Sequence, residues 1–150
     1  MLVMPLSEAD LQYYAGFFDG EGSISLIKQR ANNFRGYRFR VEVGVGQVHG
    51  WILEPLAKMF GGSSWYQRKH SSTTNGRPLL QIRWFSLQSL ELLRTLGPYL
   101  RLKKRHAEFA IEAQEILSSL RGGRGHGKAS PKRLWEIYWE LKRLNKRGLK

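Results

Sequence analysis

The chain contains no cysteine, which excludes disulfide bonds and thiolate metal sites. It also lacks an apolar run of about 18 residues, so we expect no membrane-spanning helix. The few residues before Pro5 are too short for a signal peptide. The 4 histidines are scattered without a His-Glu-x-x-His pattern, and no Ser or Thr stands in a recognisable nucleophile motif. The lack of a membrane span and of a signal peptide predicts an intracellular protein, and the compartment (bacterial or archaeal cytoplasm, or an organelle) stays open.

Acidic residues are scarce as well. The 12 Asp and Glu residues face 25 Lys and Arg residues, which gives a formal net charge of +13. No acid lies between Glu21 and Glu42 or between Glu54 and Glu91, so the basic excess is concentrated in two windows. Such an excess favours a polyanionic partner, with nucleic acid ahead of an acidic membrane. We therefore expect a nucleic-acid partner and no membrane.

The overall composition suits one folded domain over residues 1–150. Hydrophobic residues make up 41% of the 150 residues, enough for one substantial core. Hydrophobic periodicity and the positions of Gly, Pro and Asn predict the elements. Helices are expected near residues 8–19, 51–60, 86–96, 102–120 and 131–147, and strands near residues 23–30, 37–45, 64–70 and 79–85. A basic, Gly-rich loop is expected at 121–130. The fold class is therefore α/β, of the α+β type.

Three local signals refine the helix ends. Ser7 and Asp10 have the spacing of a capping box at the first helix. Ser86 is expected to cap the helix that follows it. Pro55 is awkward inside a helix, so the first turn of the segment 51–60 is expected to be offset or kinked.

The two expected hairpins carry the basic windows. Apolar residues at odd positions from 37 to 45 alternate with polar residues or Gly, which indicates a half-buried strand. A two-stranded ribbon fits the major groove of DNA, where Arg pairs with guanine and Gln with adenine. The alternative is a solvated sheet face that is merely basic. Candidate DNA contacts are Gln29, Arg38, Arg40, Tyr66, Arg68, His70, Gln81 and Arg83.

The most unusual stretch is an apolar helical run that ends in the acidic turn 19–22, Asp-Gly-Glu-Gly. A helix that is apolar on every side must be covered on every side. One interpretation of the turn is an exposed Gly-rich bend. A calcium loop of the EF-hand type is disfavoured, because Ile24 and Arg30 stand where its Gly and Glu belong. The third interpretation is a magnesium site near phosphates, with Glu21 as an oxygen ligand.

Two basic segments each have a simple interpretation beside the functional one. The string from Gly122 to Lys128 matches most of a phosphate-binding P-loop, but Ala129 replaces the magnesium-binding hydroxyl and no strand precedes it. We interpret this match as accidental and the segment as a flexible basic loop. The run from Arg101 to Arg105 is either a solvated helix start or a phosphate contact.

The stretch from Tyr14 to Gly22, YAGFFDGEG, resembles the LAGLIDADG motif of a family of homing endonucleases. The expected order of elements, Gln47 after the second strand and the run from Pro98 to Lys103 are similar to the single-motif, homodimeric members. The resemblance covers about residues 8–120. It implies an αββαββα core with an antiparallel β saddle, extra C-terminal helices and a homodimer through the motif helix.

The resemblance also implies an activity. Members of this kind are intron-encoded endonucleases that make a double-strand break in a long, pseudo-palindromic DNA site by metal-dependent phosphodiester hydrolysis. Glu21, Gln47 and Lys103 would be catalytic, and Glu21 with the Gly20 carbonyl would bind the metal. The expected metal is Mg²⁺, about two or three ions per dimer, with Mn²⁺ or Ca²⁺ able to substitute for binding, and no small-molecule cofactor is expected.

In such a dimer the motif helices of two protomers pack on each other. The resemblance places Tyr14, Ala15, Gly16, Phe18 and Asp19 at this interface, with Ala15 and Gly16 as the close contacts.

Two residues depart from the pattern of the family. Glu21 is one methylene longer than the usual Asp, and the segment His49-Gly50-Trp51 lacks the basic residue often found near there. Two other functions stay open. The first is an intron RNA maturase or a DNA-binding relative of the same fold that does not cleave. The second is a basic ribosome-associated or structural protein.

Overall fold

A computed structural model describes residues 5–30, 37–67, 77–120 and 131–146. Its elements follow the order expected from the sequence, with short 3-10 helices before α2 and after α3. The elements are α1 (Glu8–Glu21), β1 (Ser23–Arg30), β2 (Tyr37–Gln47), η1 (Gly50–Leu53), α2 (Glu54–Phe60), β3 (Ser63–Gln67), β4 (Leu79–Phe85), α3 (Ser86–Leu96), η2 (Gly97–Tyr99), α4 (Lys104–Ser119) and α5 (Lys132–Leu144). None of the helices described is long and apolar enough to cross a membrane.

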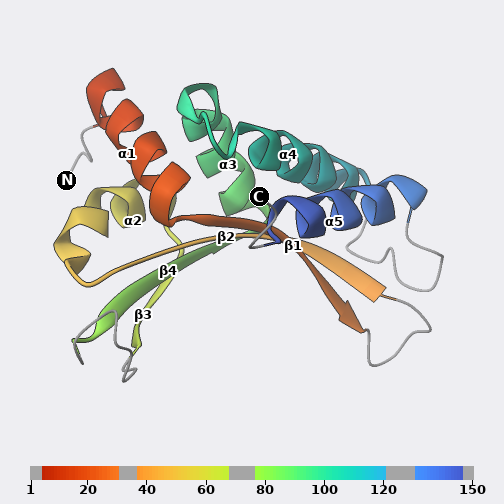
Figure 1. The fold of residues 1–150 in the computed structure, drawn as a ribbon, viewed down its shortest axis with the longest axis horizontal. Coiled ribbons are helices and arrows are strands. Elements are labelled where there is room, and N and C mark those ends of the chain that lie inside the picture. Colours follow the sequence, from red (N-terminus) through yellow and green to blue (C-terminus); the bar gives the residue numbers. More distant parts are fainter. Residues whose placement is uncertain (1–4, 31–36, 68–76, 121–130, 147–150) are drawn as a thin grey trace.

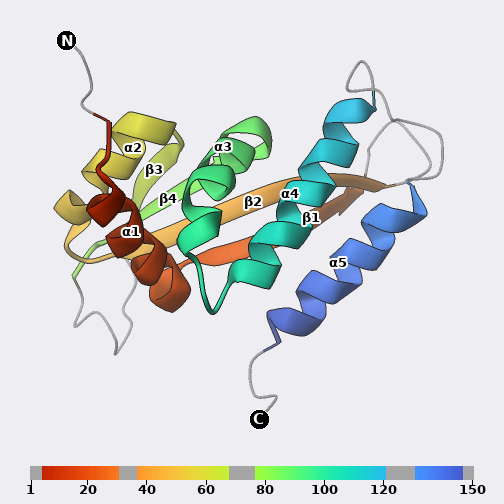
Figure 2. The same cartoon turned by 90° about the horizontal axis from the view of Figure 1, so that it is seen from above.

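The four strands form one antiparallel sheet in the order β1-β2-β4-β3. The helices cover one face of this sheet, and the strands slope away from them at both ends (Figure 1). The other face is therefore open and arched, which confirms the expected β saddle. From above, α1, α3, α4 and α5 lie side by side across the sheet (Figure 2).

The alternation of β2 produces the core. Val41 and Val43 are fully buried, and they pair with Leu26 and Ile24 of β1 on the same face. Trp84 of β4 is paired with Val43 and is also fully buried. Full burial of side chains of this size contributes about 1.5–3 kcal/mol each to folding. The strands thus attach the helical layer through one apolar face and leave the other face for polar side chains.

The C-terminal helix α5 belongs to the same core. Leu134, Ile137 and Leu141 are buried, at 1%, 0% and 2% exposure. At the end of α5, Asn145 Nδ2 donates to the carbonyl of Ile24 over 2.9 Å. The core therefore extends beyond residue 120, although the sequence resemblance ends there.

Two of the local predictions are confirmed. The capping box of Ser7 and Asp10 is formed at the start of α1. The segment with Pro55 begins as the 3-10 helix η1, and Pro55 lies in the first turn of α2, where its missing N–H costs no helical bond.

The prediction that Ser86 caps α3 is wrong. Ser86 has a φ of 51° and is the first residue of α3. Phe85 holds the cap position, and no side-chain hydrogen bond caps this helix. An N-cap side chain works from an extended backbone, which Ser86 does not have.

Gly22, directly after α1, allows a close backbone approach. A Cβ at Gly22 would lie 2.5 Å from Phe18 Cδ1 and 2.9 Å from the Phe18 carbonyl oxygen. Phe18 is 2% exposed and packs on the Trp84 ring, so it has no room to move. We expect Gly22→Ala to lower the free energy of unfolding by about 1–3 kcal/mol in urea denaturation. Gly97→Ala is the control, because a Cβ there meets no described residue within 4 Å, and an equal loss in both variants would contradict the explanation.

Candidate active site and nucleic-acid interface

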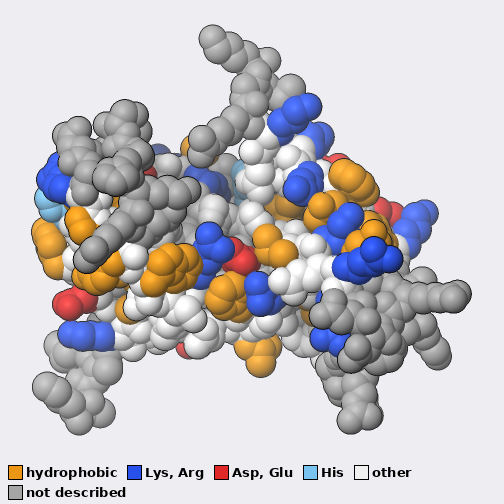
Figure 3. Space-filling model, turned by 90° about the horizontal axis from the view of Figure 1, so that it is seen from below, with side chains coloured by type: hydrophobic (Ala, Val, Ile, Leu, Met, Phe, Trp, Pro, Cys, Tyr) orange, Lys and Arg blue, Asp and Glu red, His pale blue; other side chains and the backbone are white. Residues whose placement is uncertain are grey.

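The predicted DNA contacts can be placed from the strand register. Gln29 is paired with Arg38, and Gly44 is paired with Arg83, so these side chains alternate with the buried residues of the strands. They lie on the face turned away from the helices, which we call the open face. Basic and hydrophobic side chains are mixed on this face, with acidic atoms among them near its middle (Figure 3). The open face carries Gln29, Arg38, Arg40, Gln81 and Arg83.

One predicted contact lies on the wrong face. Tyr66 is paired with Leu80, and Leu80 packs against the hydrophobic core, so Tyr66 belongs to the helical side of the sheet. Trp65 is paired with Gln81 and takes the place on the open face that was predicted for Tyr66. Strand β3 has no alternation of polar and apolar residues, so only its pairing with β4 sets the register. The predicted contacts Arg68 and His70 lie outside the described residues.

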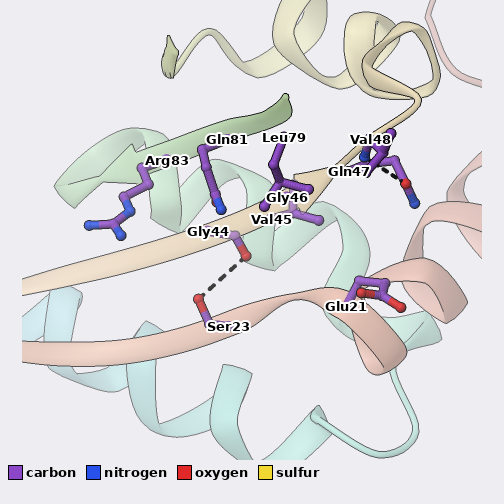
Figure 4. Close-up of a pocket in the computed structure, with 10 residues that line it drawn as sticks. All are labelled: Glu21, Ser23, Gly44, Val45, Gly46, Gln47, Val48, Leu79, Gln81 and Arg83. Atoms are coloured by element: carbon purple, nitrogen blue, oxygen red, sulfur yellow. Dashed lines mark hydrogen bonds between the residues drawn. The ribbon is translucent and has the colours of Figure 1, made fainter. Parts of the chain in front are cut away.

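Glu21 and Gln47 meet at one pocket. Glu21 is the last residue of α1 and is exposed, and Gln47 is the last residue of β2. Both line a pocket of about 400 Å³ that also reaches Gln81 and Arg83 on β4. We call it the Glu21 pocket. Glu21 and Gln47 lie at one end of it and Arg83 at the other (Figure 4). The pocket therefore joins the end of the motif helix to the open face.

The side-chain amide of Gln47 is held by the backbone. Its Oε1 accepts hydrogen bonds from the backbone N–H of Val48 at 2.8 Å and of His49 at 3.4 Å. These bonds orient the amide and leave the Nε2 group as the donor that Gln47 can offer to a ligand.

Lys103 is tied to the same end of α1 through Asp19. The Asp19 carboxylate accepts from the backbone N–H of Arg101 and of Lys103, each at 2.9 Å. Lys103 Nζ donates to the Asp19 carbonyl at 2.5 Å. Burial lowers the pKa of Lys103 from its ordinary value of 10.5, while the charges of Asp19 and Glu21 act to raise it. Glu21, Asp19 and Lys103 are thus electrostatically coupled.

The pKa of Asp19 bears on stability. Burial acts to raise it, but the N–H donors of Arg101, Lys103 and Leu102 and the charge of Lys103 outweigh burial and lower it below 3.8. The ionised carboxylate therefore favours folding. This contribution is full above pH 3.8 and is lost as pH falls through the lower pKa of the folded chain.

We expect Asp19→Asn to lower the free energy of unfolding by about 1–2 kcal/mol at neutral pH, the lower part of the range for charged hydrogen bonds because Asp19 is half-exposed. The difference from the wild type should shrink as pH falls below 3.8. Urea denaturation over a pH series measures it. Glu108→Gln, an exposed change on α4, serves as the control. A difference for Asp19→Asn that is independent of pH would show that the ionised carboxylate does not contribute.

The predicted dimer contacts lie on two sides of α1. Tyr14, Ala15 and Phe18 are buried in the chain's own core, at 5%, 0% and 2% exposure, so their prediction as interface residues is wrong. The carboxylate of Asp19 is engaged within the chain, as described above. Gly16 lies on the exposed side, together with Gln12, Tyr13 and Gly20. Apart from Gln12, these exposed residues are an aromatic residue and glycines with no charged side chain among them, so the sequence does not tell which side the core covers.

The oxygen donors around Glu21 suit a hard cation that takes its remaining ligands from water and a substrate. Within the described part of the chain, no three His, Cys, Asp or Glu side chains gather to hold a metal. Glu21 supplies a carboxylate, and the adjacent Gly20 supplies a carbonyl. Magnesium retains several waters and takes further oxygen ligands from substrate phosphates, so this small donor set suits it. The protein groups alone do not make a cage for zinc or calcium.

No family model matches the chain, and no curated protein matches it in sequence. Several solved structures do match it. The homing endonuclease I-CvuI, in complex with its target in the presence of calcium, has 21% identity and a TM-score of 0.69, and the match covers 95% of this chain and 85% of that one. The archaeal intron-encoded homing endonuclease I-Vdi141I, complexed with DNA, has 18% identity and a TM-score of 0.69 over 95% of this chain and 88% of that one.

The LAGLIDADG homing endonuclease I-SmaMI, bound to cleaved DNA, has 19% identity and a TM-score of 0.62, with 97% of this chain and 46% of that one covered. The motif in α1, the four-stranded saddle and these likenesses agree. The chain therefore has the fold of the LAGLIDADG homing endonucleases.

Proposed function

We propose that this chain is a homodimeric, site-specific endonuclease that cuts both strands of a long, pseudo-palindromic DNA duplex by metal-dependent phosphodiester hydrolysis. The observation that carries the proposal is the Glu21 pocket. It joins Glu21 and Gln47 to the arginine-bearing open face, and Lys103 is coupled to Glu21 by charge. A carboxylate, an oriented amide and a cation beside a basic surface are the groups that phosphodiester hydrolysis needs.

Duplex DNA is the substrate that best fits the open face. The face is arched, carries Arg and Gln side chains and belongs to a chain of net charge +13. Of the solved structures reported above, I-CvuI is in complex with its target, I-Vdi141I is complexed with DNA and I-SmaMI is bound to cleaved DNA. Arg and Gln are the side chains that read guanine and adenine in the major groove. The basic charge adds affinity for the phosphate backbone that depends on salt.

The glycines of α1 support a homodimer. Among the residues that the structure describes, a Cβ added at Gly16 or at Gly20 would meet nothing within 4 Å. A glycine inside a helix costs about 0.5–1 kcal/mol relative to alanine, and no contact with the described part of the chain explains that cost at Gly16. Close approach of a second α1 across a two-fold axis would explain it. The axis would bring two Glu21 pockets together and join two open faces into one long surface.

Each residue at the end of α1 and around the pocket would then have its own role in hydrolysis. Glu21 and the Gly20 carbonyl would hold Mg²⁺, which polarises a phosphoryl oxygen and lowers the pKa of a water that it binds. Gln47 offers its Nε2 donor to orient the attacking water, because its Oε1 is already held by the backbone. Lys103, held at the Asp19 carbonyl, brings a cation to the charge that develops on the phosphate. No protein nucleophile is required.

The proposal is tested by selection followed by cleavage. Duplexes that the protein binds in Ca²⁺ are selected from a random pool, cloned into a supercoiled plasmid and incubated with the protein in Mg²⁺. We expect linear plasmid cut at the selected site, and intact plasmid when EDTA replaces Mg²⁺. Tight binding without any cutting would identify a relative that does not cleave. Preference for structured RNA over duplex DNA at matched salt would identify an RNA-binding function instead.

A further inference from the structure

Glu42 lies beneath two arginines near the middle of the open face. Its Oε1 is 2.9 Å from Arg83 Nη1, and its Oε2 is 3.7 Å from Arg40 Nη2. The Glu42 side chain is only 14% exposed, whereas those of Arg40 and Arg83 are 39% and 45% exposed. The carboxylate therefore lies below the guanidinium groups, and each of its oxygens faces a different arginine.

Each guanidinium also lies over an aromatic ring. The Arg40 guanidinium carbon is 4.3 Å from the centre of the Phe85 ring, and that of Arg83 is 5.2 Å from the centre of the Trp65 ring. An arginine side chain loses conformational freedom when it is fixed. Here the carboxylate and the rings restrict this freedom before any ligand arrives. Such preorganisation strengthens later binding.

We propose that Arg40, Glu42 and Arg83 form a guanine-reading unit, in which Glu42 positions the two guanidinium groups and reads no base itself. A guanidinium has five N–H donors, so the ion pair that each arginine makes with Glu42 leaves a pair of donors for O6 and N7 of guanine. The Glu42 oxygens face the arginines and are not available to accept from cytosine. The unit rests on the proposed function only in requiring that the open face bind duplex DNA.

In this arrangement Glu42 has opposite effects on the overall affinity for DNA and on the discrimination between bases. Glu42 places a negative charge under the surface that approaches phosphates, and this charge lowers affinity for every DNA sequence. The same charge fixes the direction of two guanidinium groups, and direction is what a bidentate contact to guanine needs. Removal of the charge should therefore raise general affinity and weaken the preference for guanine.

The experiment selects bound duplexes from a random pool in Ca²⁺ and measures base preferences by sequencing. We expect the wild type to require guanine at two positions of each half-site. In Glu42→Gln, the guanine preference at both positions should fall by about tenfold, while affinity for the unselected pool rises by several-fold at low salt. Glu91→Gln, which removes an exposed acid from the helical layer, should change neither quantity.

Two further variants keep the test decisive if Glu42→Gln does not fold. Arg40→Lys and Arg83→Lys keep the charge and lose the planar fork, so each should lose one of the two guanine preferences and retain affinity for the pool. Unchanged guanine preferences in folded Glu42→Gln, or in both lysine variants, would overturn the reading unit. A wild type that binds DNA without guanine preference would overturn it too, and DNA binding would stand. A wild type that binds no duplex would overturn the proposed function itself.

Discussion

Glu21→Gln is expected to bind the selected DNA duplex as tightly as the wild type and to cut it about a thousandfold more slowly. The substitution keeps the size of the side chain and removes the negative charge, the strongest oxygen ligand that the end of α1 offers to a cation. Glu21 is exposed and lines the pocket, so its loss disturbs no packing. Cleavage rates in Mg²⁺ and binding in Ca²⁺ measure the two effects separately.

Glu8→Gln is the matched control for Glu21→Gln. Glu8 lies in the first turn of the same helix, is exposed and is distant in sequence from the pocket. We expect this variant to bind and cut like the wild type. Cleavage by Glu21→Gln at the wild-type rate would mean that hydrolysis does not depend on this carboxylate, and the assignment of the active site would be wrong.

Gly16→Leu is expected to convert the dimer to a monomer and to abolish double-strand cleavage. Gly16 is exposed, and a Cβ added there meets no atom of the described residues within 4 Å, so the isolated protomer should fold normally. Between two helices in close contact, the same side chain would hold the backbones apart. Light scattering measures the mass in solution, and plasmid cleavage measures the activity.

Two further variants are compared with Gly16→Leu. Lys132→Leu adds the same side chain at a position on α5 where the native side chain is 92% exposed, and it should leave the dimer intact. Gly16→Ala should stabilise a protomer kept monomeric by dilution by about 0.5–1 kcal/mol, because glycine is a poor helix former, and should weaken the dimer. A wild type that is a monomer, or a Gly16→Leu variant with the mass of a dimer, would contradict the proposed interface.

The sequence predicted most of the fold because its strongest signals are local. The capping box of Ser7 and Asp10 begins α1, glycines follow α1 and α2, and the alternation of β2 separates its two faces. These signals act within a few residues of each other. The motif at the end of α1 added the family resemblance, and with it the expected roles of Glu21, Gln47 and Lys103.

The incorrect predictions concern residues whose positions are set by contacts between distant parts of the sequence. Tyr14 and Phe18 lie on the core side of α1, but the other side is apolar or small as well, so the sequence offers no contrast between the sides. The face of Tyr66 depends on its pairing with Leu80 across the hairpin. In the sequence, Glu42 is only one of the polar residues that alternate along β2, because its contact with Arg83 requires the register of β2 against β4. Helix α5 is amphipathic, but its packing against β1 joins segments far apart in the sequence, which no local pattern reveals.

The most direct test of the account is a crystal structure of the protein with its selected DNA and Mn²⁺, in which anomalous scattering locates the metal. The account predicts Mn²⁺ bound by the Glu21 carboxylate, with the Gly20 carbonyl and a DNA phosphate oxygen among its other ligands. The two Glu21 residues of the dimer should lie on either side of the two-fold axis. Ordered DNA on the open face with Mn²⁺ bound elsewhere, or with no Mn²⁺ at Glu21, would contradict it.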